Sequence, residues 1–145
     1  YGDDWQVASP NHPAAGVDGA LTVKEGDRLP GLPRHSIQAE LGYALTDQLK
    51  VALEGQLTSS VHVRGDESNQ MREIPSYAVF AFTGSYAVTE RLMLTARVDN
   101  LFDREYASFG LLGEPDEVLG DEYDDPLFIS RGAPRTAWLG LRWQI

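Results

Sequence analysis

The stretch Val98-Asp99-Asn100-Leu101-Phe102-Asp103-Arg104-Glu105-Tyr106 marks the point where a regular pattern in the chain stops. Before it, residues 92–98 alternate between apolar and polar side chains, which is typical of a strand with one apolar face. Asn100 falls on the apolar parity, so we expect the strand to bulge or end there. A long acidic segment without alternation follows, up to residue 133. The stretch therefore predicts a strand that leaves a sheet into a large loop.

The same period of two residues recurs in four other runs, at 34–45, 49–64, 76–88 and 135–145. We expect the second of these strands to be longer than a bilayer requires, because its apolar parity continues through Val61 and Val63. Tight turns at 46–48 and 89–91 alternate with long segments, which read as loops, at 1–33, 65–75 and 102–133. The pattern predicts an all-β fold, an antiparallel up-and-down meander of about five strands.

Composition narrows the class of protein. The 145 residues suit one domain, and the absence of cysteine excludes thiol catalysis, thiolate metal sites and disulfide bonds. Tyr1 follows neither an initiator methionine nor a signal peptide, so we expect a mature, excised or truncated chain. No apolar run reaches the about 18 residues that a transmembrane helix needs, although membrane strands have no such run either.

The net charge of −10 is unevenly distributed. The three long segments carry −3, −2 and −7 in chain order, whereas the rest of the chain carries +2. Nucleic acid is excluded as a partner, because binding phosphates requires a basic surface. An acidic rim would suit divalent cations or cationic groups, but soluble loops are commonly acidic as well. The seven acids between Glu114 and Asp125 lack the spacing of a calcium-binding loop, so we favour a solvated loop there.

No catalytic constellation is evident. His12, His35 and His62 are scattered, without the paired spacing of a metal site, and neither a nucleophile elbow nor a phosphate-binding loop occurs. The tripeptide Arg64-Gly65-Asp66 invites an adhesion role, but a tripeptide recurs by chance. We therefore predict that the protein is not an enzyme and has neither a metal site nor a cofactor.

Three blocks carry a resemblance to a known family. The central stretch resembles the NLFD-x-x-Y signature of TonB-dependent outer-membrane receptors, through Asp99, Asn100, Leu101, Phe102, Asp103 and Tyr106. A second block is similar to the family's GDR-I/L-PG-I/L-PRH motif, through Gly26, Asp27, Arg28, Pro30, Gly31, Pro33 and Arg34. A third is similar to its RGDESN loop, through Arg64, Gly65, Asp66, Glu67 and Asn69. The blocks occur in the family's order, with matching material from about Asn11 onward.

The resemblance implies a plugged β-barrel that imports iron complexes, cobalamin or other scarce solutes. We expect 34–145 to be the last five strands of that barrel with their loops, preceded by an extracellular loop at 1–33, with the plug absent. The expected partners are outer-membrane lipid, the missing plug and barrel strands, the TonB complex, the barrel-assembly machinery and a small-molecule ligand, by family frequency a ferric siderophore. Five strands cannot close a barrel, so a fragment of a larger protein is predicted.

Connection lengths predict topology, because outer-membrane barrels have short periplasmic turns and long external loops. The turns at 46–48 and 89–91 and the C-terminus are then periplasmic. Tyr43, Tyr86 and Trp143 lie near these ends with outward parity, which is typical of an interfacial aromatic girdle. The charged residues of inward parity, which we expect to face the lumen or plug, are Glu40, Lys50, Glu54, Arg64, Arg97, Asp99 and Arg142. We expect Arg97 and Glu54 to belong to a lumen or plug network and not to bind ligand.

The final strand resembles the C-terminal signal that the barrel-assembly machinery recognises, through Gly140, Leu141, Trp143 and Ile145. The usual last residue is Phe or Trp, so Ile145 departs from the signal, and an ordinary terminal strand is the alternative. Two other readings of the whole chain stay open. One is a small soluble β-domain that binds a hydrophobic ligand with its apolar parity inside, and the other is a passive or structural outer-membrane barrel segment.

Overall fold

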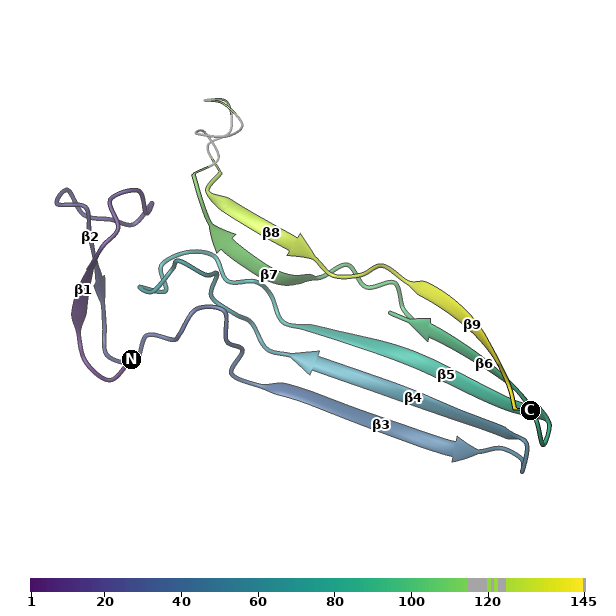
Figure 1. Ribbon diagram of the computed structural model, residues 1–145. Coiled ribbons are helices and arrows are strands. Elements are labelled where there is room, and N and C mark those ends of the chain that lie inside the picture. The colour runs from purple at the N-terminus through teal and green to yellow at the C-terminus, as the bar shows by residue number, and fades with distance from the viewer. Residues whose placement is uncertain (115–119, 121, 123–124, 145) are drawn as a thin grey trace. The chain divides into compact units, whose positions relative to one another are not determined.

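The computed structural model describes residues 1–114, 120, 122 and 125–144. Within these residues it contains nine strands, drawn in Figure 1: β1 (Trp5–Ala8), β2 (Ala20–Val23), β3 (Ser36–Ala44), β4 (Leu49–Thr58), β5 (Tyr77–Thr89), β6 (Leu92–Asp99), β7 (Ala107–Leu112), β8 (Leu127–Arg131) and β9 (Thr136–Trp143). No helix in this part of the chain is long and apolar enough to cross a membrane.

The chain divides into two compact units. The sheet unit consists of His35–Thr58, Tyr77–Tyr106 and Gly132–Ile145. The loop unit consists of Tyr1–Arg34, Ser59–Ser76 and Ala107–Arg131, and so gathers most of the three segments that the sequence predicted as long loops. The chain passes back and forth between the two units, because each strand pair of the sheet is followed by an excursion into the loop unit.

The sheet unit is an antiparallel sheet in the order β3-β4-β5-β6-β9. These strands lie side by side, with the two tight turns and the C-terminal end of β9 at the same end (Figure 1). Both turns use a threonine in the same way: Thr46 Oγ1 accepts hydrogen bonds from the backbone N–H of Gln48 and Leu49, and Thr89 Oγ1 accepts from Arg91 and Leu92. The predicted meander is therefore confirmed.

The two faces of this sheet differ in chemistry. One row in register across the five strands consists of Leu41, Leu53, Phe82, Val98 and Ala137, and the adjacent row on the other face consists of Gly42, Ala52, Thr83, Arg97 and Trp138. Much of the apolar face is open, since Leu41 is 73% exposed and Leu139 is 90% exposed. An apolar face of this extent marks a surface that another phase or partner covers. The reading that buries this parity inside a soluble domain finds no support in the sheet.

The loop unit has a core of its own. Leu21, Val23 and Val63 are almost completely buried, and Ile74 is 5% exposed. The strands β1 and β2 pair in one hairpin, β7 and β8 pair in another, and isolated bridges join Val61 to Ile74 and Arg64 to Leu111. Gly110 permits close packing in this core, because a Cβ there would lie 2.9 Å from Ile74 Cδ1 and 3.0 Å from Val63 Cγ1.

Two predictions about this region were wrong in detail. The segments 1–33 and 102–133 contain the strand pairs β1–β2 and β7–β8 and are not simple loops. The strand predicted to continue to residue 64 ends at Thr58. Both neighbouring strands begin shortly after a proline, with Pro33 before β3 and Pro75 before β5. Proline has no N–H to donate to the hydrogen-bond ladder of a sheet, so the pairing partners of β4 end there.

Beyond Thr58 the chain no longer pairs with the neighbouring strands of the sheet and instead pairs within the loop unit. The alternation of apolar and polar side chains therefore continues past the end of the strand. Val61 pairs with Ile74, and Val63 is fully buried in the loop unit. Arg64, predicted to face inward from the long strand, instead bridges Leu111. The strand that begins at Leu92 was predicted to bulge or end at Asn100, and this was right, since β6 ends at Asp99 and Asn100 has a φ of 47°.

Candidate functional site

The stretch from Asn100 to Tyr106 forms a corner where the chain leaves β6. Asn100 is 6% exposed, and its φ of 47° turns the backbone out of the strand. Its amide nitrogen donates to the carbonyls of Arg104 at 2.9 Å and Ala133 at 3.0 Å, and its Oδ1 accepts from the Arg104 N–H at 2.8 Å. The Asn100 side chain thus forms hydrogen bonds within the turn and also joins the turn to the segment that leads into β9.

Three further motif side chains strengthen this corner. Asp103 Oδ1 accepts a hydrogen bond from the Arg135 N–H at 3.0 Å, just before β9 begins. The ring of Tyr106 lies against Gly132, where a Cβ would sit 2.0 Å from the ring, and it contacts the Tyr77 ring at a centroid distance of 4.5 Å and an interplanar angle of 34°. Phe102 meets Phe80 edge to face at 5.5 Å. Leu101 donates its backbone N–H to the Phe80 carbonyl. The motif residues therefore fix the two points at which the segment between β6 and β9 leaves the sheet and returns to it.

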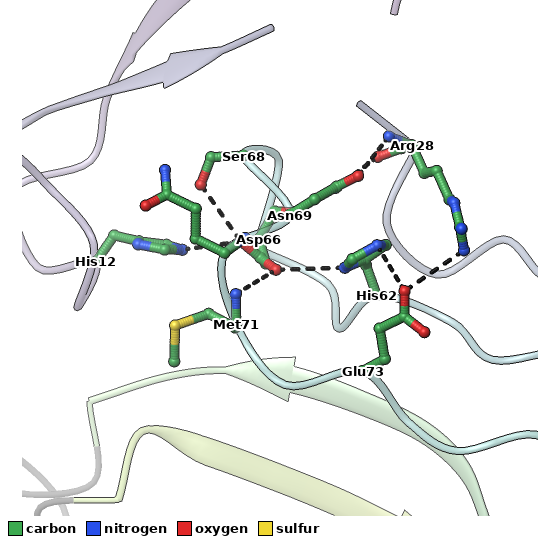
Figure 2. Close-up of polar contacts among 9 residues, drawn as sticks. His12, Arg28, His62, Asp66, Ser68, Asn69, Met71 and Glu73 are labelled. Atoms are coloured by element: carbon green, nitrogen blue, oxygen red, sulfur yellow. Dashed lines mark hydrogen bonds and ion pairs between the residues drawn. The ribbon is translucent and has the colours of Figure 1, made fainter. Parts of the chain in front are cut away.

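A second cluster, in the loop unit, surrounds the fully buried carboxylate of Asp66 (Figure 2). The backbone N–H groups of Gln70 and Met71 each donate to it at 2.9 Å, and the Ser68 hydroxyl approaches at 3.4 Å. His12 Nε2 lies 3.6 Å from Oδ1, and His62 Nδ1 lies 3.6 Å from Oδ2. We call these residues, together with Glu73, the Asp66 cluster.

Asn69 joins two of the motif blocks through this cluster. Its Oδ1 accepts from the Arg28 N–H at 2.5 Å, and its Nδ2 donates to the Arg28 carbonyl at 3.0 Å. Asn69 holds a φ of 54°, which asparagine tolerates better than most residues. Gly31, with a φ of 77°, donates its N–H to the His62 carbonyl at 2.9 Å. The blocks at 26–34 and 64–69 are therefore neighbours, whereas the block at 99–106 belongs to the sheet unit.

The remaining members of the two blocks complete the local turns. Asp27 Oδ2 accepts from the Lys24 N–H at 2.7 Å, and Arg28 Nη1 lies 3.4 Å from Glu73 Oε1. The bend at residues 29–33 contains Pro30 and Pro33, and its two leucines, Leu29 and Leu32, are exposed. Gly26 and Gly65 take positive φ values of 92° and 97°, so each occupies a conformation that a side chain would strain. Arg34 ends the first block, and Glu67 lies within the second.

Glu73 is the acid that connects the Asp66 cluster to basic residues. His62 Nε2 lies 3.0 Å from its Oε1, on the opposite side of the imidazole from Asp66. A hydrogen bond with Ser60 is the main cause that lowers the pKa of Glu73, opposed by partial burial and assisted by the charges of His62, Arg28 and Arg34. The described residues hold no group of three or more His, Cys, Asp or Glu side chains arranged to bind a metal ion.

The polar face of the sheet unit carries a charged network. Arg97 Nη1 and Nη2 donate to the two oxygens of Glu54 at 2.6 and 2.8 Å, and Arg97 Nε donates to Asp99 Oδ1 at 2.7 Å. Thr83 accepts from Arg97 at 3.2 Å, and Trp138 Nε1 donates to Asp99 Oδ2 at 3.1 Å. This network spans β4, β5, β6 and β9. It borders a hollow of about 550 Å³ whose lining includes Glu40 and Gln56.

The other charged residues of this face are more isolated. Glu40 lies directly opposite Glu54 in the register of β3 and β4. Lys50 lies opposite Ala44 and Ser85, and Arg142 lies opposite Met93 near the end with the tight turns. All three side chains are exposed. The structure thus brings Arg97, Glu54 and Asp99 together and leaves Lys50 and Arg142 apart from them.

The predicted aromatic girdle and C-terminal signal lie on the same sheet. Tyr43, Tyr86 and Trp143 are 68%, 43% and 63% exposed, near the end with the tight turns. Leu141 has the same apolar parity, and Gly140 lies on the polar face opposite Thr95, where a Cβ would sit 2.5 Å from Oγ1. Ile145 and most of the acidic run at 114–125 lie outside the described residues.

Sequence reasoning missed the assembly of His12, His62 and Glu73 around Asp66. These residues are as far as 61 positions apart, from 12 to 73, so no spacing rule connects them. The one local signal was the separation of four residues between His62 and Asp66. His12 and His62, which are scattered in the sequence, approach the same carboxylate.

Comparisons with known proteins agree on one architecture. A family model described as TonB dependent receptor-like, beta-barrel, matches residues 3–101. The siderophore receptor PiuA from Acinetobacter baumannii aligns with 20% identity and a TM-score of 0.67, over 82% of this chain and 15% of that chain. The ferric yersiniabactin uptake receptor FyuA from Yersinia pestis aligns with 24% identity and a TM-score of 0.65, over 82% and 17%.

The copper transporter OprC is also similar, with 21% identity and a TM-score of 0.59, over 86% of this chain and 20% of that chain. The chain therefore spans between 15% and 20% of the length of these structures. At these identities the likeness concerns the fold, which is a portion of a large antiparallel barrel.

Proposed function

This chain belongs to the TonB-dependent receptor-like β-barrel family, and from that premise we propose that it supplies the last strands and external loops of a receptor that imports a scarce solute. The family and the similar structures are transport receptors, so an enzyme is the wrong class. The observation that carries the proposal is the two-faced sheet, in which an open apolar face lies opposite a charged, networked face.

Receptors of this family are outer-membrane barrels, and we place this sheet in the barrel wall. The apolar face meets lipid and the polar face meets the lumen, because a lysine or arginine at the bilayer midplane costs about 2–4 kcal/mol. The tight turns and the C-terminus are periplasmic, and the loop unit is extracellular. Tyr43, Tyr86 and Trp143 then lie at the periplasmic interface, where aromatic side chains are favoured.

The network around Arg97 has a positioning role in this proposal. The bidentate pair with Glu54 is the arrangement in which an arginine is held most firmly, and it joins strands that are not adjacent. Such a network stiffens the wall against which a plug packs. Arg97 and Glu54 therefore act as lumen residues and not as ligand contacts.

The solute is a metal or a metal complex, and a ferric siderophore is our first candidate. Two of the similar structures are named for siderophore or ferric yersiniabactin uptake and one for copper transport. Energy would come from the TonB complex through parts of the receptor other than this chain. Gly140, Leu141, Trp143 and Ile145 would present the final strand to the barrel-assembly machinery.

Uptake by the full-length receptor tests this proposal. A strain that lacks its own siderophore receptors and expresses this one should accumulate one labelled ferric siderophore from a panel, and should lose uptake when TonB is deleted. Uptake that persists without TonB would identify a passive barrel instead. The variant Arg97→Glu should reduce uptake without changing the amount of ligand bound by the loops, whereas a loss of binding alone would make Arg97 a ligand residue.

Topology can be tested independently because the chain has no cysteine. Single cysteines at Asp47 and Glu90, in the tight turns, should resist a membrane-impermeant maleimide in intact cells and react after the outer membrane is opened. A cysteine at Glu67, in the loop unit, should react at once. Labelling of the turns in intact cells would contradict the orientation.

A further inference from the structure

Glu40 and Glu54 place two carboxylates directly opposite each other on the polar face of the sheet unit, in the register of β3 and β4. Facing side chains on neighbouring strands have Cβ atoms about 4.5–5.5 Å apart, so like charges at these positions repel and destabilise a sheet. Glu54 has its counter-charge, because Arg97 donates to both of its oxygens at 2.6 and 2.8 Å. Glu40 is exposed, and among the described residues it forms no ion pair.

The other side chains around Glu40 cannot supply a cation. Its neighbours on this face, along β3 and diagonally across on β4, are all neutral: Gln38, Gly42, Ala52 and Gln56. Lys50 is four residues from Glu54 along β4, which is roughly 13 Å at about 3.3 Å per residue. Arg97 lies two strands beyond β4 and already holds Glu54 and Asp99. A counter-charge for Glu40 can therefore come only from the side that faces away from β4.

That side is the outer edge of the sheet. β3 is the first strand in the order β3-β4-β5-β6-β9, and β4 is its one hydrogen-bonded neighbour within the described residues (Figure 1). A closed barrel has no open edge, so in the barrel wall a preceding antiparallel strand lies about 4.8 Å from β3. The residue of that strand opposite Glu40 shares its polar face. The inference below rests on the proposed function through this neighbouring strand.

We propose that the barrel strand preceding β3 carries an arginine or a lysine directly opposite Glu40, and that this base forms an ion pair with Glu40 on the lumen side of the wall. The two facing carboxylates are then flanked by a cation on each side, with the new base at Glu40 and Arg97 at Glu54. Arginine fits best, because its planar fork matches a carboxylate.

The hollow beside these carboxylates suits a long basic side chain. Its volume is about 550 Å³, and its lining on β3 and β4 includes the oxygen-bearing side chains of Gln38, Glu40, Glu54 and Gln56. A guanidinium has five N–H groups, so it can donate to Glu40 and also to an amide oxygen of this lining. The base and Arg97 together balance the three acids of this region, Glu40, Glu54 and Asp99, to within one charge.

Crosslinking in a cysteine-free full-length receptor identifies the residue opposite Glu40. Glu40→Cys is combined with single cysteines along the preceding strand, and each pair is treated in membranes with a short bis-thiol reagent before peptides are mapped by mass spectrometry. The pair Glu40→Cys and Glu54→Cys, which face each other in register, is the positive control. Gln38→Cys is the register control and should select a position two residues later, because the strands are antiparallel.

The position that Glu40→Cys selects should hold an arginine or a lysine in the unaltered receptor. A neutral or acidic residue at that position would overturn the inference and leave the barrel wall intact, with Glu40 solvated in the lumen. If no position of a preceding strand reacts although the control pair does, both the inference and the proposed barrel wall are wrong. The two failures are therefore distinguishable.

A double-mutant cycle tests whether the two residues interact. Glu40→Gln alone has opposing effects, because it removes the ion pair and also relieves the repulsion from Glu54, so the coupling is the readout. Replacing the base by glutamine should lower the ratio of folded to unfolded receptor in lipid vesicles by up to roughly fivefold when Glu40 is present, and by much less in the Glu40→Gln background. Lys50→Gln is the matched control, and its effect should simply add to that of Glu40→Gln. Equal costs of neutralising the base in both backgrounds would overturn the ion pair.

Discussion

The loop unit and the sheet unit of this chain are stable for opposite reasons. The loop unit buries Leu21, Val23 and Val63 in a small core of its own and completes it with a fully buried carboxylate. The sheet unit has regular strands and an aligned register, yet leaves Leu41 and Leu139 open on its apolar face. In the first case the chain supplies the apolar environment, and in the second it requires one from outside. The two units should therefore respond to different kinds of substitution.

The largest difference should come from a charge on the apolar face. Leu53 lies at the centre of the row that includes Leu41 and Phe82, so Leu53→Arg should destabilise the receptor in bilayers by about 2–4 kcal/mol if lipid covers this face. Urea titration of the refolded receptor in lipid vesicles measures this effect. Gln56→Arg, on the polar face of the same strand, is the control and should cost little. Equal effects of the two variants would remove the distinction between the faces.

A loss of the buried acid should strike the loop unit alone. Asp66→Ala removes the acceptor of the Gln70 and Met71 N–H groups, and a buried donor left without a partner costs about 1–3 kcal/mol. Hydrogen exchange should accelerate across 59–76 while β3 to β6 keep their protection. The partly exposed neighbour Glu67, changed to glutamine, serves as the control. Loss of protection in the sheet strands as well would mean that the two units unfold together.

The corner at Tyr106 should show how the sheet unit depends on one glycine. Gly132→Ala places a methyl group within the volume of the Tyr106 ring, and overpacking of this kind costs about 1–3 kcal/mol. We expect a value toward the lower end, because Tyr106 can swing away from Tyr77. Fraying of the Asp99–Thr136 end of β6 and β9, read by hydrogen exchange, is the measurement. Gly84→Ala, where a Cβ meets nothing within 4 Å, should leave the sheet unchanged.

The contrast between the units also explains what the sequence could predict. The sheet strands and tight turns follow from a two-residue period, because each strand shows its apolar face directly in the order of its residues. The same rule failed beyond Thr58, where Val61 and Val63 keep the parity but pair and pack locally. Alternation reports which side of the chain is apolar, and it does not report which neighbour covers that side.

The Asp66 cluster was beyond sequence reasoning for a related reason. Its members come from two distant segments of the chain, at His12 and at 62–73, and polar contacts between such segments leave no periodic pattern in the sequence. The family-like blocks contain Arg28, Asp66 and Asn69 without indicating that they meet, and in the structure Asn69 bonds both backbone groups of Arg28. The pairing of Arg97 with Glu54 was easier to anticipate, because both lie on the polar parity of strands in one meander.

The smallest expected effect is a loss of stability at low pH that is confined to the loop unit. The pKa of Glu73 is lowered in the folded state, chiefly by its hydrogen bond with Ser60, so ionised Glu73 stabilises the loop unit above about pH 4.5. This contribution is lost as the pH falls through the lowered value, because the folded state must then take up a proton that the unfolded state already holds. Hydrogen exchange across 59–76 should therefore rise less steeply toward acid in Glu73→Gln than in the wild type.

Glu25→Gln, at an exposed site of the same unit, is the control and should follow the wild-type profile. Identical acid profiles for the wild type and Glu73→Gln would show that Glu73 is solvated in the native loops, and the stability of the loop unit would then rest on its apolar core and on Asp66.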